Sequence, residues 1–394
     1  MATGQENMAP QCIASTSSTA SPFTQAQFSG DGTTIVTLSA DHTFRTFFVP
    51  ENLLDATKQP HTLTPSFTTP SPSAVQSYAL YPKFDYDNPS TRVFLTAATD
   101  LPITLTNVVE GATHNITYPL YDATNEKYLV PKSLVWTPDG ERFIAGSLNQ
   151  ISIFDVRRYH QGPLHELPTT NSKKSRKIYG RVPGCIGHIM GLSINSTNGM
   201  LAAGTTEREV ALYDGVAKEC WSSFTLPKPV LNEYGAATGI TQTAWSPEGT
   251  YLFAAERQSN GVHVYDIRNT QSRVSFLAGR NATTPQRMGF NITMTARGYE
   301  LWAGGIDGCV RMWKNPGSVF ETHHSDAAFK MHDSPVSSAV WHPEGWVMAT
   351  CAGKDGNFAA DSESSGGEPS DGGSSDESVV EEARADNSLK IWTV

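Results

Sequence analysis

The sequence lacks the long apolar segments that mark membrane proteins and exported proteins. Its 394 residues contain no run of about 18 apolar residues, so we expect no membrane-spanning helix. The segment from Met1 to Ser21 is polar and shows no basic region followed by an apolar one, so we expect no secretion signal. Charged residues make up only 17% of the chain and aromatic residues 10%, and this balance excludes a wholly disordered protein.

The sequence also lacks the motifs of metal sites and of the common enzyme classes. Its cysteines form no Cys-x-x-Cys pair, which excludes the usual zinc spacing and gives no disulfide framework. His323, His324 and Asp326 lack the spacing of a helical metal motif. No P-loop, Rossmann fingerprint or Gly-x-Ser-x-Gly elbow occurs. We therefore expect no enzyme activity, no metal and no cofactor.

The net charge of −10 is unevenly distributed along the chain. Residues 355–386 contain ten acidic residues and one base, Arg384, so this stretch alone carries −9. Most of its other residues are Ser and Gly, which bury too little apolar area to offset the entropy of ordering the chain. We predict a disordered acidic loop over residues 355–387, which serves as a spacer, as a docking segment for a basic partner or as a site of serine phosphorylation.

A basic segment lies between residues 157 and 181. Its seven basic residues stand against Glu166 alone, which gives a net charge of +6. Such cations contact phosphates, and a neighbouring tyrosine can stack on an unpaired base, so this is the candidate RNA-binding segment. A nuclear-import signal and a plain solvated loop are the alternatives. The candidate residues are Arg157, Arg158, Lys173, Lys174, Arg176, Lys177, Tyr179 and Arg181.

A recurring pattern of short strands and turns organises the chain. Residues 133–155 show three alternating strands, with Pro138-Asp139-Gly140 between the first two. Proline presets φ and glycine supplies a positive φ, so this triplet predicts a tight turn. Residues 244–266 and 340–350 repeat the pattern with Pro-Glu-Gly turns, although the third strand of the last copy is delayed until 389–392. Weaker copies occupy residues 28–47, 78–106, 193–214 and 292–313.

Seven units of roughly 50 residues, each with three clear strands and a less regular fourth, predict an all-β, seven-bladed WD40 propeller. The last unit ends at its third strand, so we predict that residues 9–16 supply the fourth strand and close the ring. Residues 1–23 then form an N-terminal segment, and residues 24–394 form a single propeller domain. Tryptophans at strand positions are expected to anchor the core. They are Trp136, Trp245, Trp302, Trp313, Trp341 and Trp392.

The order of the irregular features resembles the WD-repeat family of telomerase Cajal-body proteins. Residues 28–51 resemble the first repeat of that family, and residues 81–103 continue it. Gly187-His188-Ile189 and the acidic interruption within the last unit follow in the same order. The resemblance spans residues 24–394.

This resemblance implies a non-enzymatic nuclear scaffold. Members of the family bind the hairpin loop of small Cajal-body RNAs and of telomerase RNA and guide them to Cajal bodies, and fungal relatives are tied to small nuclear RNA and pre-mRNA splicing. We therefore expect a monomeric propeller that binds a small nuclear or Cajal-body RNA, with telomerase RNA among the candidates, together with RNP proteins. The alternative is a platform that binds only proteins, for example in splicing complexes.

Overall fold

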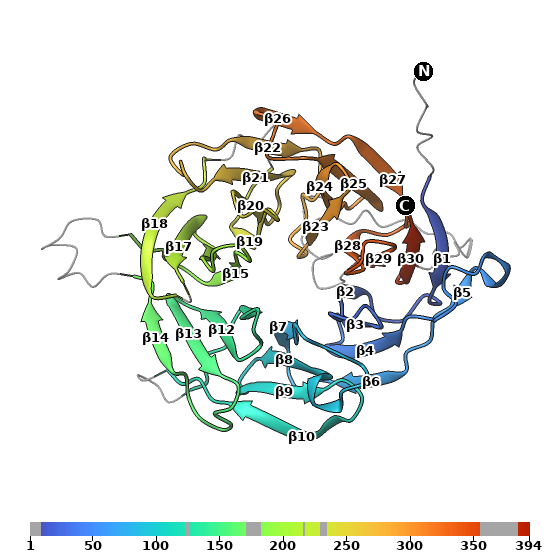
Figure 1. Cartoon of the computed structure of the whole chain (residues 1–394), viewed down its shortest axis with the longest axis horizontal. Coiled ribbons are helices and arrows are strands. Elements are labelled where there is room, and N and C mark those ends of the chain that lie inside the picture. The colour runs from blue at the N-terminus through green and yellow to red at the C-terminus, as the bar shows by residue number, and fades with distance from the viewer. Residues whose placement is uncertain (1–8, 123–126, 171–182, 216, 229–234, 355–384) are drawn as a thin grey trace, which may run out of the picture.

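A computed structural model describes residues 9–122, 127–170, 183–215, 217–228, 235–354 and 385–394. Its strands form seven sheets arranged in a ring around a central axis (Figure 1). Each sheet is one blade, and its first strand lies nearest the axis. The predicted all-β, seven-bladed propeller is therefore confirmed, including the unit at residues 78–106, which lacks the proline-containing turn.

Six blades each take their four main strands from one continuous stretch of chain. Blade 1 contains β2 (Phe23–Phe28), β3 (Thr34–Ser39), β4 (Thr43–Phe48) and β6 (Phe67–Pro70). Blade 2 contains β7 (Val75–Leu80), β8 (Val93–Ala98), β9 (Ile103–Asn107) and β10 (Gly111–Tyr118). Blade 3 contains β11 (Ser133–Trp136), β12 (Arg142–Ser147), β13 (Gln150–Asp155) and β14 (His165–Pro168). Blade 4 contains β15 (Ile189–Ile194), β16 (Leu201–Thr205), β17 (Glu209–Asp214) and β18 (Glu219–Thr225). Blade 5 contains β19 (Ile240–Trp245), β20 (Tyr251–Glu256), β21 (Gly261–Asp266) and β22 (Ser275–Ala278). Blade 6 contains β23 (Phe290–Thr295), β24 (Gly298–Gly304), β25 (Cys309–Lys314) and β27 (Ala327–Lys330).

Blade 7 joins the two ends of the chain. Its strands are β28 (Val336–Trp341), β29 (Met348–Ala352), β30 (Leu389–Thr393) and β1 (Gln11–Ser15). β1 runs antiparallel to β30, with Gln11 opposite Thr393 and Ser15 opposite Lys390. The predicted closure of the ring by the N-terminal strand is confirmed, and it removes two free sheet edges.

Four short elements lie outside this pattern, and the two strands among them cover outer edges. β5 (His61–Thr62) pairs in parallel with β1, and it follows the 3-10 helix η1 (Ala56–Lys58) in the connection between β4 and β6. β26 (Glu321–His324) pairs in parallel with β22, so blade 5 also gains a fifth strand. A second 3-10 helix, η2 (Pro89–Thr91), lies between β7 and β8. Short strands that cover a blade edge limit edge-to-edge pairing between molecules.

The buried apolar side chains form clusters that each lie between two neighbouring blades. One such cluster joins Trp136 and Phe143 of blade 3 to Leu95 of blade 2. The Trp136 indole also donates to the Ala79 carbonyl across the same boundary, at 3.1 Å. The six tryptophans predicted to anchor the core all belong to these clusters, although Trp341 is only partly buried. Packing between blades therefore holds the ring together.

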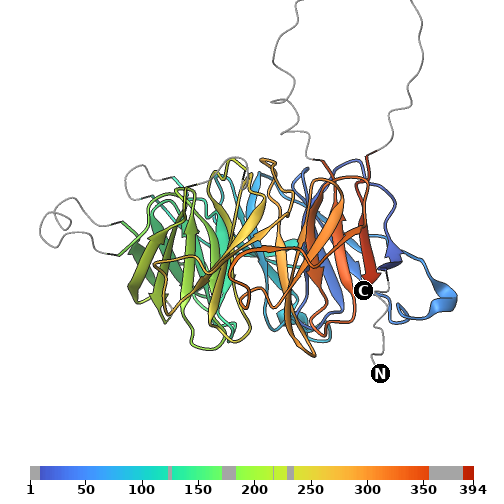
Figure 2. The same ribbon diagram turned by 90° about the horizontal axis from the view of Figure 1, so that it is seen from above.

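The alternating strands place the loops on two opposite faces of the ring. We call the upper face the one that carries each connection from a fourth strand to the next blade and each turn from a second to a third strand. The lower face carries the turns between first and second strands and those between third and fourth strands. Figure 2 shows the ring from its side, with the strands running between these faces.

A chain of four side chains holds the upper edge of blade 7. Trp392 Nε1 donates to Thr350 Oγ1 at 2.7 Å, and that hydroxyl lies 2.7 Å from His332 Nε2. His332 Nδ1 lies 3.0 Å from Asp386 Oδ2. Burial lowers the pKa of His332, so we assign it as neutral, with its proton on Nδ1 and its Nε2 accepting from Thr350. Each side chain in the series then donates to the next.

Asp386 corrects one boundary of the predicted acidic loop. This residue was placed in the disordered segment 355–387, but its carboxylate accepts from His332 and from Lys390, the latter at 3.0 Å. Burial opposes ionisation here, yet the hydrogen bonds from His332, Ser388 and Lys390 hold the pKa of Asp386 well below its usual range. Residues 385–387 therefore belong to blade 7, and residues 355–384 lie outside the described residues.

We predict that Asp386→Asn lowers the free energy of unfolding at pH 7 by about 2 kcal/mol, because it removes a charged acceptor from a buried hydrogen-bonded series. A carboxylate whose pKa is lowered in the folded state stabilises the protein above its unfolded pKa near 4 and loses this effect as the pH falls further. The difference between wild type and variant should therefore shrink between pH 5 and pH 3. Urea unfolding measures both quantities.

The matched control is Asp100→Asn, at the equivalent turn of blade 2, where the side chain is exposed. We expect this control to change the free energy of unfolding by less than about 0.5 kcal/mol. Equal effects of the two substitutions would contradict the role assigned to Asp386.

Candidate nucleic-acid interface

The predicted basic segment is divided between the two faces of the ring. Arg157 and Arg158 follow β13 and lie on the lower face, in the turn that leads to β14. β14 then carries the chain across the thickness of the ring, so Thr170 and Pro183, which flank residues 171–182, lie on the upper face. The charge of the segment did not indicate this division. The four-residue strand β14 crosses the ring, so residues before it and after it lie on opposite faces. Six candidates lie outside the described residues, namely Lys173, Lys174, Arg176, Lys177, Tyr179 and Arg181.

The two candidates on the lower face already have partners. Arg157 Nη2 lies 3.0 Å from Glu141 Oε1, and both side chains are largely exposed. Arg158 Nε donates to Gln161 Oε1 at 2.9 Å. Exposed pairs of this kind contribute little to stability, but Glu141 reduces the local positive potential. Arg157 and Arg158 are therefore the weaker part of the predicted interface.

Exposed aromatic and apolar side chains lie on the upper face between blades 2 and 4. The connection from β10 to β11 folds back on itself, and its Tyr121 and Tyr128 rings stack with centroids 4.8 Å apart. Tyr121 is 52% exposed. Leu148 and Ile186 also lie on this face, and they are 49% and 41% exposed. Thr170 and Pro183, which flank residues 171–182 in the sequence, therefore lie on the face that carries the stacked tyrosines.

Three partly buried cations lie at the axial end of the upper face. Lys132 precedes β11, Arg257 follows β20 and Arg287 lies shortly before β23, so all three stand where first and second strands reach this face. Lys132 Nζ donates to Gln76 Oε1 at 2.7 Å, and Arg287 Nη2 donates to the Thr241 carbonyl at 2.9 Å. The Arg257 side chain makes no hydrogen bond or ion pair within the described ranges. No carboxylate pairs with any of the three there.

The pKa values of these three cations are all lowered, and Arg257 contributes to the shifts of the other two. Burial lowers the pKa of Lys132, and the positive charge of Arg257 lowers it further. Burial also lowers the pKa of Arg287 to about 10, again with a contribution from Arg257. Burial alone lowers the pKa of Arg257. Each group is desolvated without an opposing charge, which is uncommon for a buried cation.

Two other arginines near the same face have acidic partners. Arg311 is hydrogen-bonded to Asp307 by two nitrogens, at 2.6 and 3.0 Å. Arg208 lies 2.5 Å from Glu256, which also contacts His263. Lys132, Arg257 and Arg287 therefore differ from these arginines, whose charges are compensated.

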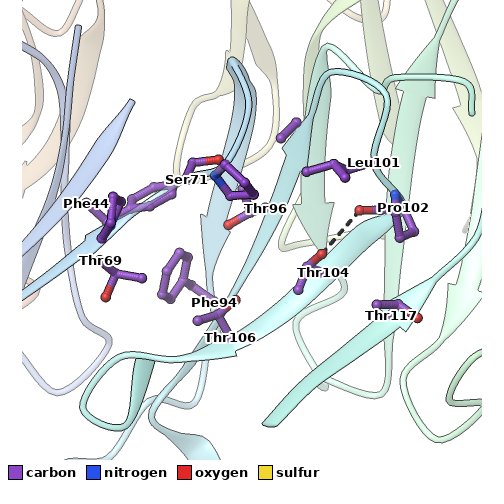
Figure 3. Close-up of a pocket in the computed structure, with 13 residues that line it drawn as sticks. Phe44, Thr69, Ser71, Phe94, Thr96, Leu101, Pro102, Thr104, Thr106 and Thr117 are labelled. Carbon is purple, nitrogen blue, oxygen red and sulfur yellow. Dashed lines mark hydrogen bonds between the residues drawn. The ribbon is translucent and has the colours of Figure 1, made fainter. Parts of the chain in front are cut away.

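A neutral pocket opens between blades 1 and 2, near the upper face. It has a volume of about 240 Å³, and Figure 3 shows Phe44 and Phe94 on one side of it and Leu101 and Pro102 on the other. The two phenylalanine rings lie 4.8 Å apart. The lining holds apolar groups and threonine hydroxyls but no charged side chain among the described residues. This pocket suits an uncharged group and cannot by itself hold a phosphate.

Sequence reasoning missed Lys132, Arg257 and Arg287 because no two of them lie close together in the chain. A charge run reveals residues that are adjacent in sequence, whereas these three are adjacent only when the ring closes. An alignment of the repeats could have indicated the cluster, because all three residues stand next to the upper end of a first or second strand. The cluster is therefore recognised from equivalent positions in different blades and not from the composition of one segment.

No arrangement of metal ligands is present in the part of the chain that the structure describes. His323 Nε2 lies 3.2 Å from Asp326 Oδ2, and this pair has no third ligand there. Within the same residues, no helix is both long and apolar enough to cross a membrane.

Comparison with known proteins shows which family has this ring. The chain is 30% identical to guanine nucleotide-binding protein negative regulator 1 of Schizosaccharomyces pombe over 310 residues, which are 76% of this chain and 72% of that protein. It is 24% identical to telomerase Cajal body protein 1 of Bos taurus over 327 residues, 82% of this chain and 56% of the bovine protein. The chain belongs to the WD-repeat family of telomerase Cajal-body proteins.

A fungal branch of this family is represented as well. Protein SWT21 of Vanderwaltozyma polyspora is 24% identical over 322 residues, which are 79% of this chain and 72% of that protein. The chain spans a little over half the length of the mammalian telomerase Cajal body proteins that it matches. No family model matches the chain. The suspected resemblance is thus confirmed at the level of the family and its propeller scaffold.

We predict that Arg257→Gln leaves the free energy of unfolding unchanged or raises it by up to about 1 kcal/mol, because it removes a desolvated charge with no acidic partner among the residues that the structure describes. The contrasting variant is Arg311→Gln, which leaves Asp307 without its two hydrogen bonds and should lower the free energy of unfolding by about 1.5 kcal/mol or more. Urea unfolding at pH 7 compares them. Equal losses would show that Arg257 has a structural role.

Proposed function

We propose that this propeller is a nuclear scaffold that binds a small nuclear or Cajal-body-type RNA on its upper face and assists the assembly or localisation of an RNP. The observation that carries the proposal is the stacked pair Tyr121 and Tyr128, on the same face as Thr170 and Pro183, which flank the basic residues 171–182 in the sequence. Aromatic rings and cations on one surface are the two groups that single-stranded RNA requires.

Each group would contact a different part of the RNA. The phosphates would interact with the basic residues of segment 171–182, and this contribution weakens as salt is added because bound counterions are released. Unpaired bases would stack on the tyrosines, which favours an RNA loop over a continuous duplex. The uncharged pocket between blades 1 and 2 lies near the same face and would accept an apolar or aromatic group.

The family supports this assignment without deciding it. The name of the bovine relative places that protein in the Cajal body and connects it with telomerase. We extend a nuclear location and a small RNA ligand, with telomerase RNA among the candidates, to this chain as part of the proposal. The proposal assigns the propeller no reaction and no cofactor.

A protein-binding platform is the second candidate, and the lower face favours it. Trp346 is 61% exposed, Met294 is 64% exposed and Phe320 is 75% exposed, and all three lie on or next to that face. Large exposed apolar side chains often mark surfaces that bind another protein. The name of the Schizosaccharomyces pombe relative describes a regulator of a guanine nucleotide-binding protein. RNP proteins would use this face while RNA occupies the other.

We predict that the double variant Tyr121→Ala, Tyr128→Ala weakens binding of a box H/ACA hairpin RNA about tenfold, because stacking contributes about 1–3 kcal/mol per base. Filter binding at several salt concentrations measures the affinity.

Replacing Lys173, Lys174, Arg176 and Lys177 together by Ala should reduce the slope of log K against log salt by about 3.

The matched control is Tyr159→Ala on the lower face, because Tyr159 is 51% exposed and Tyr121 is 52% exposed. We expect this control to bind RNA like the wild type. Absence of RNA binding at low salt would reject the proposal in favour of the protein platform. A loss in Tyr159→Ala as large as in the double variant would reject the upper face.

A further inference from the structure

A small polar cavity occupies the upper half of the axial channel. It has a volume of about 100 Å³, and first strands of several blades line it. The lining is rich in amide and hydroxyl groups, including Gln25, Gln27, Ser77 and Gln242. Arg287 is the only charged residue among the described residues that line it. The cavity therefore presents hydrogen-bonding groups and one positive charge, but no negative charge from those residues.

Arg287 is fixed in place by the backbones of two other blades. Its Nη2 donates to the Thr241 carbonyl of blade 5 at 2.9 Å and to the Met190 carbonyl near the start of blade 4 at 3.3 Å. Its other N–H groups make no hydrogen bond within the described residues. A guanidinium carries five N–H donors in a rigid plane, so this anchoring leaves donors for a ligand and holds them in a defined direction.

Arg257 and Lys132 extend this positive site along the channel mouth. Lys132 directly precedes Ser133, which lines the cavity. The backbone N–H of Arg257 donates to the Gly239 carbonyl at 2.8 Å, two residues before Thr241, whose carbonyl holds Arg287. His188 is close enough to Lys132 for that charge to lower its pKa, in addition to the effect of burial, and its Nδ1 is buried without a hydrogen-bond partner among the described residues. Counting only partners in the described ranges, the mouth holds three cations without an acidic partner and one polar nitrogen without a hydrogen bond.

We propose that the upper mouth of the axial channel binds a phosphate group of an RNA strand, held between Arg257, Arg287 and Lys132. A phosphate accepts several hydrogen bonds at once and supplies the negative charge that the three cations lack. This assignment rests on the proposed function, because it identifies which phosphate contacts the upper face makes at its centre. Lys132 follows Tyr128 by four residues in the connection from β10 to β11. An RNA strand whose bases stack on the two tyrosines would therefore run toward this mouth.

Inorganic phosphate tests the site without RNA. Differential scanning fluorimetry of the full chain should show a rise in Tm with phosphate, relative to chloride at equal ionic strength, because a ligand that binds only the folded state stabilises it. Arg257→Gln should abolish the phosphate-dependent rise, and Arg257→Lys should retain most of it by keeping the charge. Arg268→Gln is the control and should respond like the wild type, because Arg268 follows β21 on the lower face and pairs there with Asp266.

Filter binding with the hairpin RNA then tests whether the phosphate bound at the channel mouth belongs to an RNA. Arg257→Gln should reduce the slope of log K against log salt by about 1, the change expected for loss of one phosphate contact. A phosphorylated peptide serves as competitor, and we expect it to displace the RNA only at much higher concentration than unlabelled RNA does.

The two proposals fail in different ways. RNA binding with an unchanged salt slope in Arg257→Gln, together with no phosphate effect on Tm, would overturn the phosphate site and leave the upper-face RNA interface intact. A phosphate effect on Tm without any RNA binding would overturn both the RNA function and the RNA occupant. Displacement by the phosphorylated peptide at lower concentration than RNA would assign the mouth to a protein ligand instead.

Discussion

The pairing of β1 with β30 is the interaction on which the rest of the ring depends. Every blade packs its apolar face against two neighbours, and blade 7 can do so only when a strand from the start of the chain joins three from its end. Ile13 and Leu389 are both buried in the cluster that this joint completes. Without the joint, blade 7 would expose the edge of β30, and blades 1 and 7 would lose a common core.

Closure also creates the electrostatic features of the molecule. The side chains at the channel mouth come from the connections before blades 3 and 6 and from the turn within blade 5, and they meet because the ring brings all inner strands to one axis. At two other places an acidic residue offsets a nearby cation: Asp41 does so for Arg45 in blade 1, and Asp386 does so for Lys390 in blade 7. A cluster without such an offset stores unfavourable electrostatic energy, which an anionic ligand would relieve.

The strand repeats could be predicted from sequence because each of them is a local pattern. A turn such as Pro138-Asp139-Gly140 needs only a few residues to form, and Gly140 indeed has a φ of 72°. Closure could be predicted as well, since a strand count leaves one place unfilled. The cations Lys132, Arg257 and Arg287 could not be predicted from a charge run, because their proximity follows from the tertiary fold. Asp386 was misplaced for a related reason: composition assigned it to its acidic neighbours, whereas its contacts with His332 and Lys390 place it in the blade.

Blade 7 combines the first strand of the chain with three strands from its other end, and this has a consequence for how the protein folds during synthesis. During translation the ribosome releases β1 first and β30 last, with the six other blades between them. Those blades can form in order as they emerge, because each is built mainly from consecutive strands. The growing chain then holds an open arc with two unsatisfied ends until β30 appears. Cotranslational folding of this protein must therefore end with a single late step in which the first strand, synthesised long before, is captured by the last.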